Sequence, residues 1–330
     1  MSWRPVVTIV IPMLDEIDAI EACLDAFEEQ TYPLELLDVV VVDGGSTDGS
    51  RTLVEHRAAR SPWLRMIDNP DRRASAAFNR GMEEGKGEVV ALFSAHGVPE
   101  PSYVERSVLA LDETGAAGVG GRYDHVGTEP ASAAIGLAMA SPFGMASPHR
   151  FASQRADVDT ISHPAYRREP MLAVGGFDER LLRNSDYEFN YRMRAAGYRL
   201  VFEPSIGSIY RPRRSLGALG RQFWWYGRWK ERVVRLHPGS RKARHLVPPA
   251  AVALAATTPV LVLHWRGRRL VAAAALGYGL LGLAALGRER PWRHGADPTT
   301  FLAALPVMHG AWGAGYLTSL IEDRLRRRGA

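Results

Sequence analysis

The sequence contains a single cysteine among its 330 residues, and this scarcity limits how the fold can be held together. Cys23 has no second cysteine with which to form an internal disulfide bond. A small module stapled by disulfides is therefore excluded, and packing must hold the fold, as is typical of a chain that faces a reducing cytosol. At about 150 residues per domain, the length allows about two packed units.

Acidic residues are scarce in the last third of the chain. Residues 211–330 contain 21 Lys and Arg but only 5 Asp and Glu, whereas residues 1–210 contain 20 and 31. A basic segment of this kind suits nucleic acid or anionic lipid. We expect no nucleic-acid partner, because the basic residues border apolar stretches instead of lining a groove.

Charged residues are absent from three C-terminal stretches, residues 246–265, 270–287 and 298–321. Each approaches the length of about 20 apolar residues that crosses a bilayer. We therefore expect two or three transmembrane helices in a multi-pass plasma-membrane protein, with buried core helices as the alternative. No secretory signal opens the chain, since the apolar run 5–14 stops at two acidic residues, so the first half is expected to stay in the cytoplasm.

The chain is expected to have three parts. Residues 1–212 form a globular unit, residues 213–245 an interfacial helix with a basic linker, and residues 246–330 a membrane domain. The segment 216–236 has three Trp and one Tyr among five Arg and Lys, a pattern typical of helices that lie in the bilayer interface. A soluble helix is the alternative.

The first 120 residues alternate short apolar runs with amphipathic segments, which predicts an α/β fold. The runs are apolar throughout, as a mostly parallel sheet with helices on both faces requires. From residue 118 to residue 212 the pattern is irregular, and we expect loops there. The predicted strands are 6–13, 37–42 and 88–93, and the predicted helices are 17–30, 48–60 and 74–85.

Acidic side chains follow two of these strands. Asp43 follows the second strand and precedes two glycines, and Asp15 and Glu16 follow the first strand. Ligands of such folds bind at the carboxyl ends of the strands, and nucleoside hydroxyl groups need acceptors. A nucleoside site is one interpretation of these carboxylates, and a helix N-cap is the other.

Two further positions are candidates for chemistry. His96 follows the strand 88–93 and could bind a metal ion beside a diphosphate, although a lone His is more often structural. Asp186 precedes a helical run, where the helix dipole favours a negative charge. A structural N-cap explains Asp186 equally well.

In order and spacing, these motifs resemble glycosyltransferase family 2 proteins with a GT-A fold, in particular the membrane-attached enzymes of succinoglycan-type exopolysaccharide synthesis. The likeness covers about residues 6–230. The matching segments are residues 10–16, 42–49, 76–81, 174–179, 186–192 and 227–229, together with His309 to Gly313.

The resemblance implies a donor nucleotide site in the first half of the chain. The residues carried over to it are Pro12, Asp15, Glu16, Asp43, Arg73, Asn79, Ser94 and Ala95. The family's metal motif, Asp-x-Asp or Asp-x-His, falls on residues 94–96, where Ser94 replaces the first carboxylate. His96 would then hold a divalent cation with water and diphosphate oxygens, which suits Mn²⁺ better than Mg²⁺.

The same resemblance implies that Asp186 is the catalytic base. Arg228 and Trp229 resemble the end of the family's Gln-x-x-Arg-Trp motif and are expected near the acceptor or a diphosphate. His163 is expected to line the acceptor cleft or, equally, to pack in the core. We expect Glu16, Asp43, His96 and Asp186 to converge on one crevice.

These expectations predict an inverting glycosyltransferase that moves a sugar from a nucleotide-sugar donor, UDP-linked, to a hydroxyl group of a lipid-linked saccharide. Two alternatives fit the same residues. One is a glycosyltransferase that acts on polyprenyl phosphate, and the other is a non-catalytic membrane scaffold that binds a nucleotide sugar.

Overall fold

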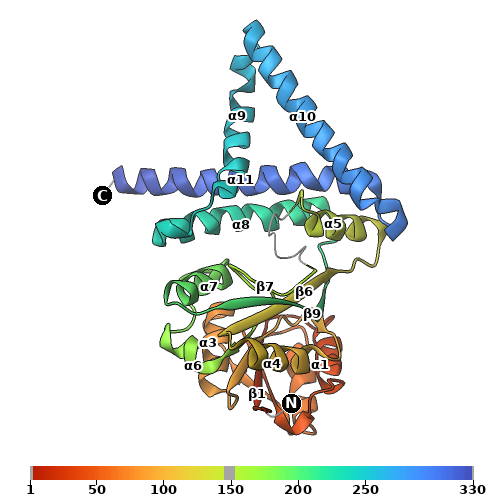
Figure 1. Cartoon of the computed structure of the whole chain (residues 1–330), viewed down its shortest axis with the longest axis vertical. Helices are drawn as coiled ribbons and strands as arrows, with labels where there is room; N and C mark the ends of the chain where they lie inside the picture. The colour runs from red at the N-terminus through yellow and green to blue at the C-terminus, as the bar shows by residue number, and fades with distance from the viewer. Residues whose placement is uncertain (1–2, 145–152, 329–330) are drawn as a thin grey trace. The chain divides into compact units, whose positions relative to one another are not determined.

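The computed structural model describes residues 3–144 and 153–328, and this part of the chain divides into two compact units. The first unit contains the described residues up to Asp124 and those from Ser153 to Tyr210. The second contains residues 125–144 and those from Arg211 onward. Figure 1 shows a sheet with flanking helices in the first unit and long helices in the second.

The first unit carries the sheet. Its strands are β1 (Val7–Met13), β2 (Leu37–Asp43), β3 (Leu64–Asp68), β4 (Val89–Leu92), β5 (Gly97–Pro99), β6 (Gly118–His125), β7 (Ala156–Asp157), β8 (Ala165–Arg167) and β9 (Leu200–Tyr210). Its helices are α1 (Ile20–Glu28), α2 (Ser50–Ala58), α3 (Ala74–Glu84), α4 (Tyr103–Thr114), α6 (Arg168–Ala173) and α7 (Ser185–Ala195), with a 3-10 turn over Leu34–Leu36.

The sheet is mixed, which corrects the prediction of a mostly parallel sheet. Its order is β3-β2-β1-β4-β8-β6-β9-β5, with β7 beside β9. Strands β3, β2, β1 and β4 are parallel neighbours. Strand β8 is antiparallel to β4 and β6, and β9 is antiparallel to β5 and β7. The parallel half places the carboxyl ends of β1, β2 and β4 at one edge.

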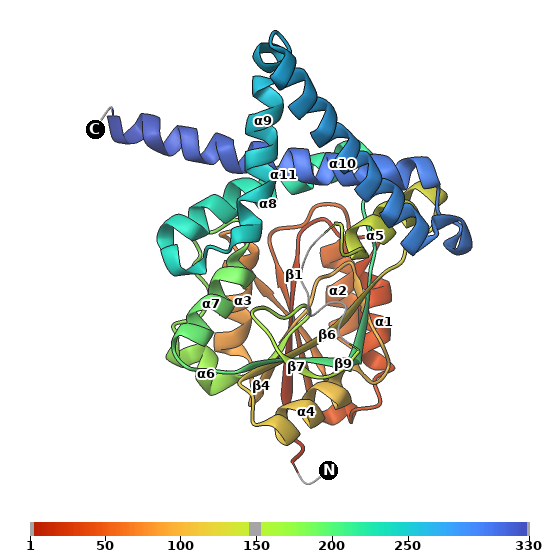
Figure 2. The same ribbon diagram turned by 45° about the horizontal axis from the view of Figure 1, so that its top comes forward.

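The apolar runs of β1 and β2 are buried on both faces, as the sequence predicts. Ile9 and Ile11 pack with α1, α2 and α4, whereas Val10 packs with α3 and α7 on the other face. Successive side chains of a strand point to opposite faces, so a strand covered on both faces is apolar at most positions instead of at alternate ones. Figure 2 shows α3 and α7 on one side of the strands and α1 and α2 on the other.

The region 118–212 is more regular than the sequence predicts. It contains β6, β8, α6, α7 and β9, and only residues 145–152 lie outside the described residues. The strand β8 has three residues and β7 has two, which is too short for a periodic pattern. Their pairing is long-range, so the alternation that identifies a strand in sequence is missing here.

The second unit is helical. Its helices are α5 (Pro130–Ala140), α8 (Leu216–Leu236), α9 (Val247–Leu261), α10 (Trp265–Glu289) and α11 (Pro298–Arg328), with 3-10 turns at Pro238–Ser240, Ala243–His245 and Pro291–His294. Helix α11 contacts α5, α8 and α9. Phe301, Ala304 and Met308 of α11 are fully buried. The core of this unit is therefore built around α11.

One segment of the described residues, Trp265–His294, is long and apolar enough to cross a membrane by length and composition. Helix α9 has only 15 residues. Helix α11 has 31 residues but packs its apolar side chains on neighbouring helices. The sequence predicts two or three crossings, and the structure supports one candidate. The two differ because a helix buried in protein and a helix buried in lipid have the same apolar sequence.

Candidate active site

Asp43, the last residue of β2, is buried and organises the loop that follows it. Its Oδ1 accepts hydrogen bonds from the backbone N–H of Ser46 at 3.1 Å and from the Ser46 hydroxyl at 2.6 Å. Nη1 of Arg51 donates to Oδ2 at 3.0 Å. These protein donors hold the carboxylate at the strand end and fix the Gly44–Gly45 turn, where Gly45 has φ +82°.

Arg51 and Asp68 belong to the same arrangement and were not identified from the sequence. Nη1 of Arg51 also contacts Oδ1 of Asp68 at 2.7 Å, and Asp68 pairs with Asp43 in the register of β2 and β3. The hydrogen bond that Arg51 donates to Asp68, and then the one that it donates to Asp43, raise the pKa of its guanidinium. The sequence does not predict strand β3. Its last residue, Asp68, is therefore missing from the predicted group of strand-end carboxylates.

The loop after β1 is bonded to the loop after β2. Asp15 has φ +54°, and its Oδ1 accepts the N–H of Thr47 at 2.8 Å, while its own N–H donates to the Ser46 hydroxyl at 2.9 Å. The N–H of Glu16 points to the Ser50 hydroxyl at 3.4 Å. The two acidic strand ends therefore form one structure, with Pro12 half-buried in β1 below it.

Glu16 and His96 lie side by side. Oε1 of Glu16 is 3.3 Å from Nδ1 of His96, and both side chains are partly exposed. Carboxylate oxygen and imidazole nitrogen are both ligands of Mn²⁺, and the imidazole suits it better than it suits Mg²⁺. No group of three His, Cys, Asp or Glu in the described ranges could hold a metal ion. A cation at this pair would have two protein donor atoms and would need its remaining ligands from water or from a bound molecule.

Ser94 lies next to a buried histidine. Its hydroxyl is 3.2 Å from Nε2 of His163, and the Tyr123 hydroxyl is 2.8 Å from the same nitrogen. Nδ1 of His163 lies 2.8 Å from the Ser208 hydroxyl, and its ring stacks on Phe93 with centroids 3.9 Å apart. His163 thus has the surroundings of a packing residue, one of its two predicted roles. Its position in an acceptor cleft stays a prediction.

Tyr123 and Tyr210 connect the side chains around His163 with His96. Neither tyrosine is among the residues predicted from the sequence. The rings of Tyr123 and Tyr210 lie 5.2 Å apart, and those of Tyr210 and His96 lie 6.2 Å apart. Both tyrosines come from β6 and β9, in the region expected to form loops. Ala95, which lies between Ser94 and His96, is buried, and its predicted place in the donor site stays a prediction.

Arg73 and Asn79 of the α3 segment hold a distant turn. Nδ2 of Asn79 donates to the carbonyl of Phe177 at 3.0 Å and to the Glu179 carboxylate at 2.7 Å. Oδ1 of Asn79 accepts the N–H of Phe177 at 2.7 Å. Nη1 of Arg73 donates to the carbonyl of Glu179 at 3.0 Å. In this structure both side chains position the segment 174–179, and their predicted contact with the donor's diphosphate and ribose stays a prediction.

Asp186 lies at the start of a helix, as the sequence predicts: it is an exposed residue in the first turn of α7, whose N-cap is Asn184. Its helix is fixed on the sheet by Tyr166, whose hydroxyl donates to Oδ1 of Asn190 at 2.7 Å. Burial, and then the negative charge of Asp186, raise the pKa of the Tyr166 hydroxyl. Within residues 3–144 and 153–328, no hydrogen bond or ion pair joins Asp186 to Glu16, Asp43 or His96, so the convergence of all four stays a prediction.

Arg228 and Trp229 lie in the second unit, on α8. Nη2 of Arg228 donates to Glu322 of α11 at 2.7 Å, and its guanidinium lies over the ring of Trp224 at 5.1 Å. Trp229 is buried. In the described part of the chain, Nε of Arg228 and Nε1 of Trp229 are buried donors without a hydrogen-bond partner.

Comparison with known proteins bears on what this arrangement does. The family model "Glycosyl transferase family 2" matches residues 8–172. The chain is 35% identical over 324 residues to succinoglycan biosynthesis protein ExoA of Rhizobium meliloti, covering 96% of each. It is 25% identical to dolichyl N-acetyl-alpha-D-glucosaminyl phosphate 3-beta-D-2,3-diacetamido-2,3-dideoxy-beta-D-glucuronosyltransferase of Methanococcus voltae, covering 69% of the chain and 74% of that relative.

The fold is also similar to that of a solved structure, the mannosyltransferase PcManGT from Pyrobaculum calidifontis in complex with GDP-Man and Mn²⁺. The TM-score is 0.64 at 23% identity, covering 97% of this chain and 88% of the other. This likeness shows a GT-A fold. The family model covers half of the chain, and the match to ExoA extends along nearly the whole of both proteins. The chain therefore belongs to glycosyltransferase family 2 and is a glycosyltransferase.

Proposed function

We propose that this glycosyltransferase moves a sugar from a nucleotide-sugar donor, UDP-linked, to a hydroxyl group of a lipid-linked saccharide, with inversion at the anomeric carbon. The observation that carries the proposal is the contact between Glu16 and His96 beside the acidic β2 loop. This edge offers acceptors for nucleoside hydroxyl groups and donor atoms for a cation at the diphosphate.

The relatives support the two substrates. The name of the Methanococcus voltae relative contains a sugar attached to dolichyl phosphate, and that of ExoA places it in succinoglycan synthesis. The PcManGT structure contains a nucleotide sugar and Mn²⁺. A lipid-linked acceptor also agrees with an apolar helix of membrane-spanning length in this chain.

Asp186 is the proposed base. Its carboxylate takes the proton of the acceptor hydroxyl while that oxygen forms a bond to the anomeric carbon. The bond from this carbon to the diphosphate oxygen breaks, and the nucleoside diphosphate leaves with the electron pair. A divalent cation held by Glu16 and His96 would supply positive charge to the leaving diphosphate. Holding both substrates in line provides the rest of the acceleration.

Arg228 is proposed to face the phosphates of the acceptor. Its side chain shares the surface of α8 with Arg232, and burial, followed by the positive charge of Arg228, lowers the pKa of Arg232. Glu322 contacts Arg228, so two arginines share this carboxylate's charge. A phosphate would relieve the excess positive charge, and the unpartnered Nε of Arg228 is a donor suited to it.

Sugar transfer by the purified full-length protein tests the proposal. UDP-sugars, Mn²⁺ or Mg²⁺ and a polyprenyl-linked saccharide are supplied, and released nucleoside diphosphate is measured. The Asp186→Asn variant should lose at least about a hundredfold in kcat, the scale of general-base catalysis, and still bind UDP. Asp112→Asn, a matched change on the exposed face of α4, should keep normal turnover. Normal turnover of Asp186→Asn would exclude Asp186 as the base.

The product decides between this acceptor and polyprenyl phosphate itself. Transfer to a phosphate oxygen gives an acid-labile glycosyl phosphate lipid, whereas transfer to a hydroxyl group gives a glycoside that resists mild acid. Mild acid treatment followed by mass spectrometry of the lipid product separates the two. Release of the newly added sugar as a free monosaccharide, instead of as part of an oligosaccharide, would overturn the proposed acceptor.

A further inference from the structure

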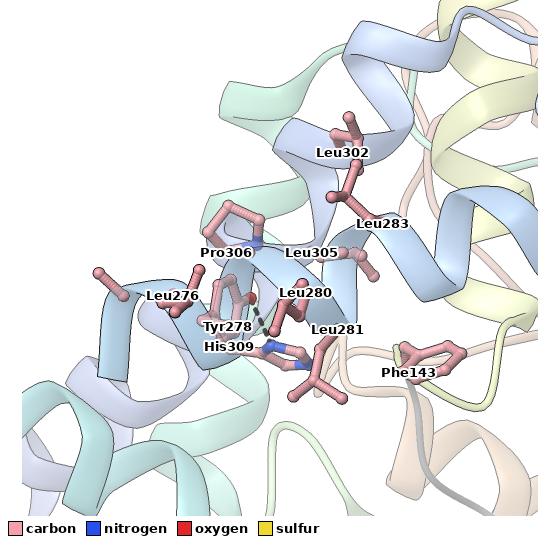
Figure 3. A pocket seen from close by; sticks show the side chains of 13 residues that line it. Phe143, Leu276, Tyr278, Leu280, Leu281, Leu283, Leu302, Leu305, Pro306 and His309 are labelled. Atoms are coloured by element: carbon pink, nitrogen blue, oxygen red, sulfur yellow. Dashed lines mark hydrogen bonds between the residues drawn. The ribbon is translucent and has the colours of Figure 1, made fainter. Parts of the chain in front are cut away.

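Helices α10 and α11 enclose a half-open cavity of about 540 Å³ in the second unit (Figure 3). The size is that of a typical small-ligand pocket. Leucine side chains form most of its wall, and Phe143 closes one side. No Asp, Glu, Lys or Arg is among the described residues that line it. The leucines concerned are Leu276, Leu280, Leu281, Leu283, Leu302 and Leu305.

The polar groups of the cavity satisfy each other. The Tyr278 hydroxyl lies 2.9 Å from Nδ1 of His309, and Figure 3 shows this hydrogen bond between the two helices. The wall therefore presents mainly hydrocarbon to an occupant. A charged or strongly polar ligand would lose its hydration there without gaining partners.

Glycines keep the cavity open. Gly279 and Gly282 line it, and a Cβ added at Gly279 would meet no atom within 4 Å. Leu280 and Leu283 are 57% and 60% exposed on the same helix, which is the candidate membrane segment. A cavity on such a helix opens toward a hydrocarbon phase if the helix crosses a bilayer.

We propose that this α10–α11 cavity holds the isoprenoid chain of the lipid-linked acceptor. The inference rests on the proposed function and names the part of the substrate that the second unit binds. The same helix that lines the cavity through His309 carries Glu322, which pairs with Arg228 near Arg232. One unit thus offers an apolar cavity for a chain and basic side chains for an anionic head group.

The separation of the two regions favours a long chain. His309 and Glu322 are 13 residues apart on α11, which corresponds to about 20 Å at 1.5 Å per residue. The chain of an ordinary phospholipid spans about half of a ~30 Å hydrocarbon core, or about 15 Å. A polyprenyl chain is longer than one leaflet and can bridge the distance with its phosphates at the arginines.

Photolabelling of the full-length protein in phosphatidylethanolamine and phosphatidylglycerol vesicles tests this assignment. One probe is a long-chain polyprenyl phosphate with a diazirine near the far end of its chain, and the other is phosphatidylglycerol with a diazirine in an acyl chain. Peptides from α10 and α11 are analysed by mass spectrometry. The polyprenyl probe should label Leu280, Leu302 and Leu305, and unlabelled polyprenyl phosphate should compete.

Two matched variants make the test specific. Gly279→Leu places a side chain in the cavity and should lower labelling about tenfold, the effect of excluding about two methylene groups. Gly277→Leu, on the same helix but outside the lining, also has no atom within 4 Å of an added Cβ and should keep normal labelling. Equal labelling by the phosphatidylglycerol probe, or unchanged labelling of Gly279→Leu, would overturn the assignment.

The labelling experiment tests the isoprenoid site, and the sugar-transfer assay tests the proposed function, so a failure of one can be distinguished from a failure of the other. Competed labelling of the cavity in a protein that transfers no sugar would support the isoprenoid site and contradict the proposed function. Normal transfer to a long-chain acceptor, with the KM of Gly279→Leu equal to that of Gly277→Leu and no cavity label, would contradict the site and leave the proposed function intact.

Discussion

Nδ1 of His96 lies 3.3 Å from Oε1 of Glu16, although 80 positions separate them in the sequence. The contact exists because β1 and β4 are parallel neighbours, with Val10 paired to Leu92, so both strands end at the same edge. The backbone N–H of Phe93 donates to the carbonyl of Val10 at 3.0 Å and carries this pairing beyond the strand. The sheet register therefore decides which carboxylate stands beside the histidine.

Removing this histidine should weaken the response to Mn²⁺. His96→Ala should raise the Mn²⁺ concentration for half-maximal sugar transfer about tenfold, because one of two protein donor atoms is lost, a change of about 1.4 kcal/mol. The measurement is turnover against Mn²⁺ concentration at saturating donor. His56→Ala, an exposed histidine on α2, serves as the control. An unchanged Mn²⁺ response of His96→Ala would remove His96 from the cation site.

Asn79 should affect kcat indirectly, by positioning the segment 174–179. Asn79→Asp loses the amide that donates to the carbonyl of Phe177 and places a carboxylate beside Glu179. The acceptor for the N–H of Phe177 is kept, so the 174–179 turn is held more weakly. We expect kcat to fall about tenfold or more, because small displacements near reacting groups are costly, while the Kd for UDP stays the same. Calorimetry of UDP binding and steady-state kinetics separate the two. A weaker UDP affinity would instead indicate that Asn79 contacts the donor.

Asp38 should make the stability of the first unit depend on pH. Burial raises the pKa of this β2 carboxylate, but hydrogen bonds from Arg65, the N–H of Lys86 and Thr8 outweigh burial and lower it below the ordinary value. A lowered folded-state pKa stabilises the fold above the unfolded-state pKa of about 3.9, and this stability is lost as the pH falls below it.

The variant Asp38→Asn tests this dependence. At pH 7 its thermal unfolding midpoint should lie about 5 °C lower, since Arg65 loses its charged partner in a buried site. Between pH 7 and pH 4 the difference should persist, and below about pH 4 it should shrink. A constant difference at all pH values would show that the loss comes from packing and not from the carboxylate charge.

Gly227 should be required for the packing of α8 on α11. A Cβ at Gly227 would collide with the carbonyl oxygen of Trp312, and one at Gly315 would collide with that of Trp224. The two backbones therefore touch. Gly227→Ala should cost about 1–3 kcal/mol by overpacking, seen as a lower unfolding midpoint in detergent.

Gly217 provides the matched control on the same helix. An added Cβ there meets only the end of Arg221 at 3.9 Å. Gly217→Ala should therefore be neutral or stabilise the helix by up to about 1 kcal/mol, since alanine restricts the unfolded chain. Equal destabilisation by both variants would contradict a close backbone crossing at Gly227.

Part of the candidate site could be predicted because its residues follow apolar strands. Asp43 ends β2, Asp15 and Glu16 lie in the loop after β1, and His96 lies in the segment after β4. The apolar runs of these strands are buried on both faces. The turn glycines and the first turn of α7 with Asp186 are also local features. The partners Asp68, Tyr123, Ser208 and Tyr210 lie on strands with weak patterns, and only long-range pairing brings them to the site.

The sequence by itself determined the strands β1, β2 and β4, the acidic residues at the ends of β1 and β2, and the aromatic, basic helix α8, because periodicity and turn residues act over short distances. Only the tertiary structure decided that β8 is antiparallel to β4, that His163 is buried among Phe93, Tyr123 and Ser208, and that α11 forms the core of its unit. Apolar character requires burial but does not specify whether protein or lipid covers the surface. That choice depends on which distant segments pack together.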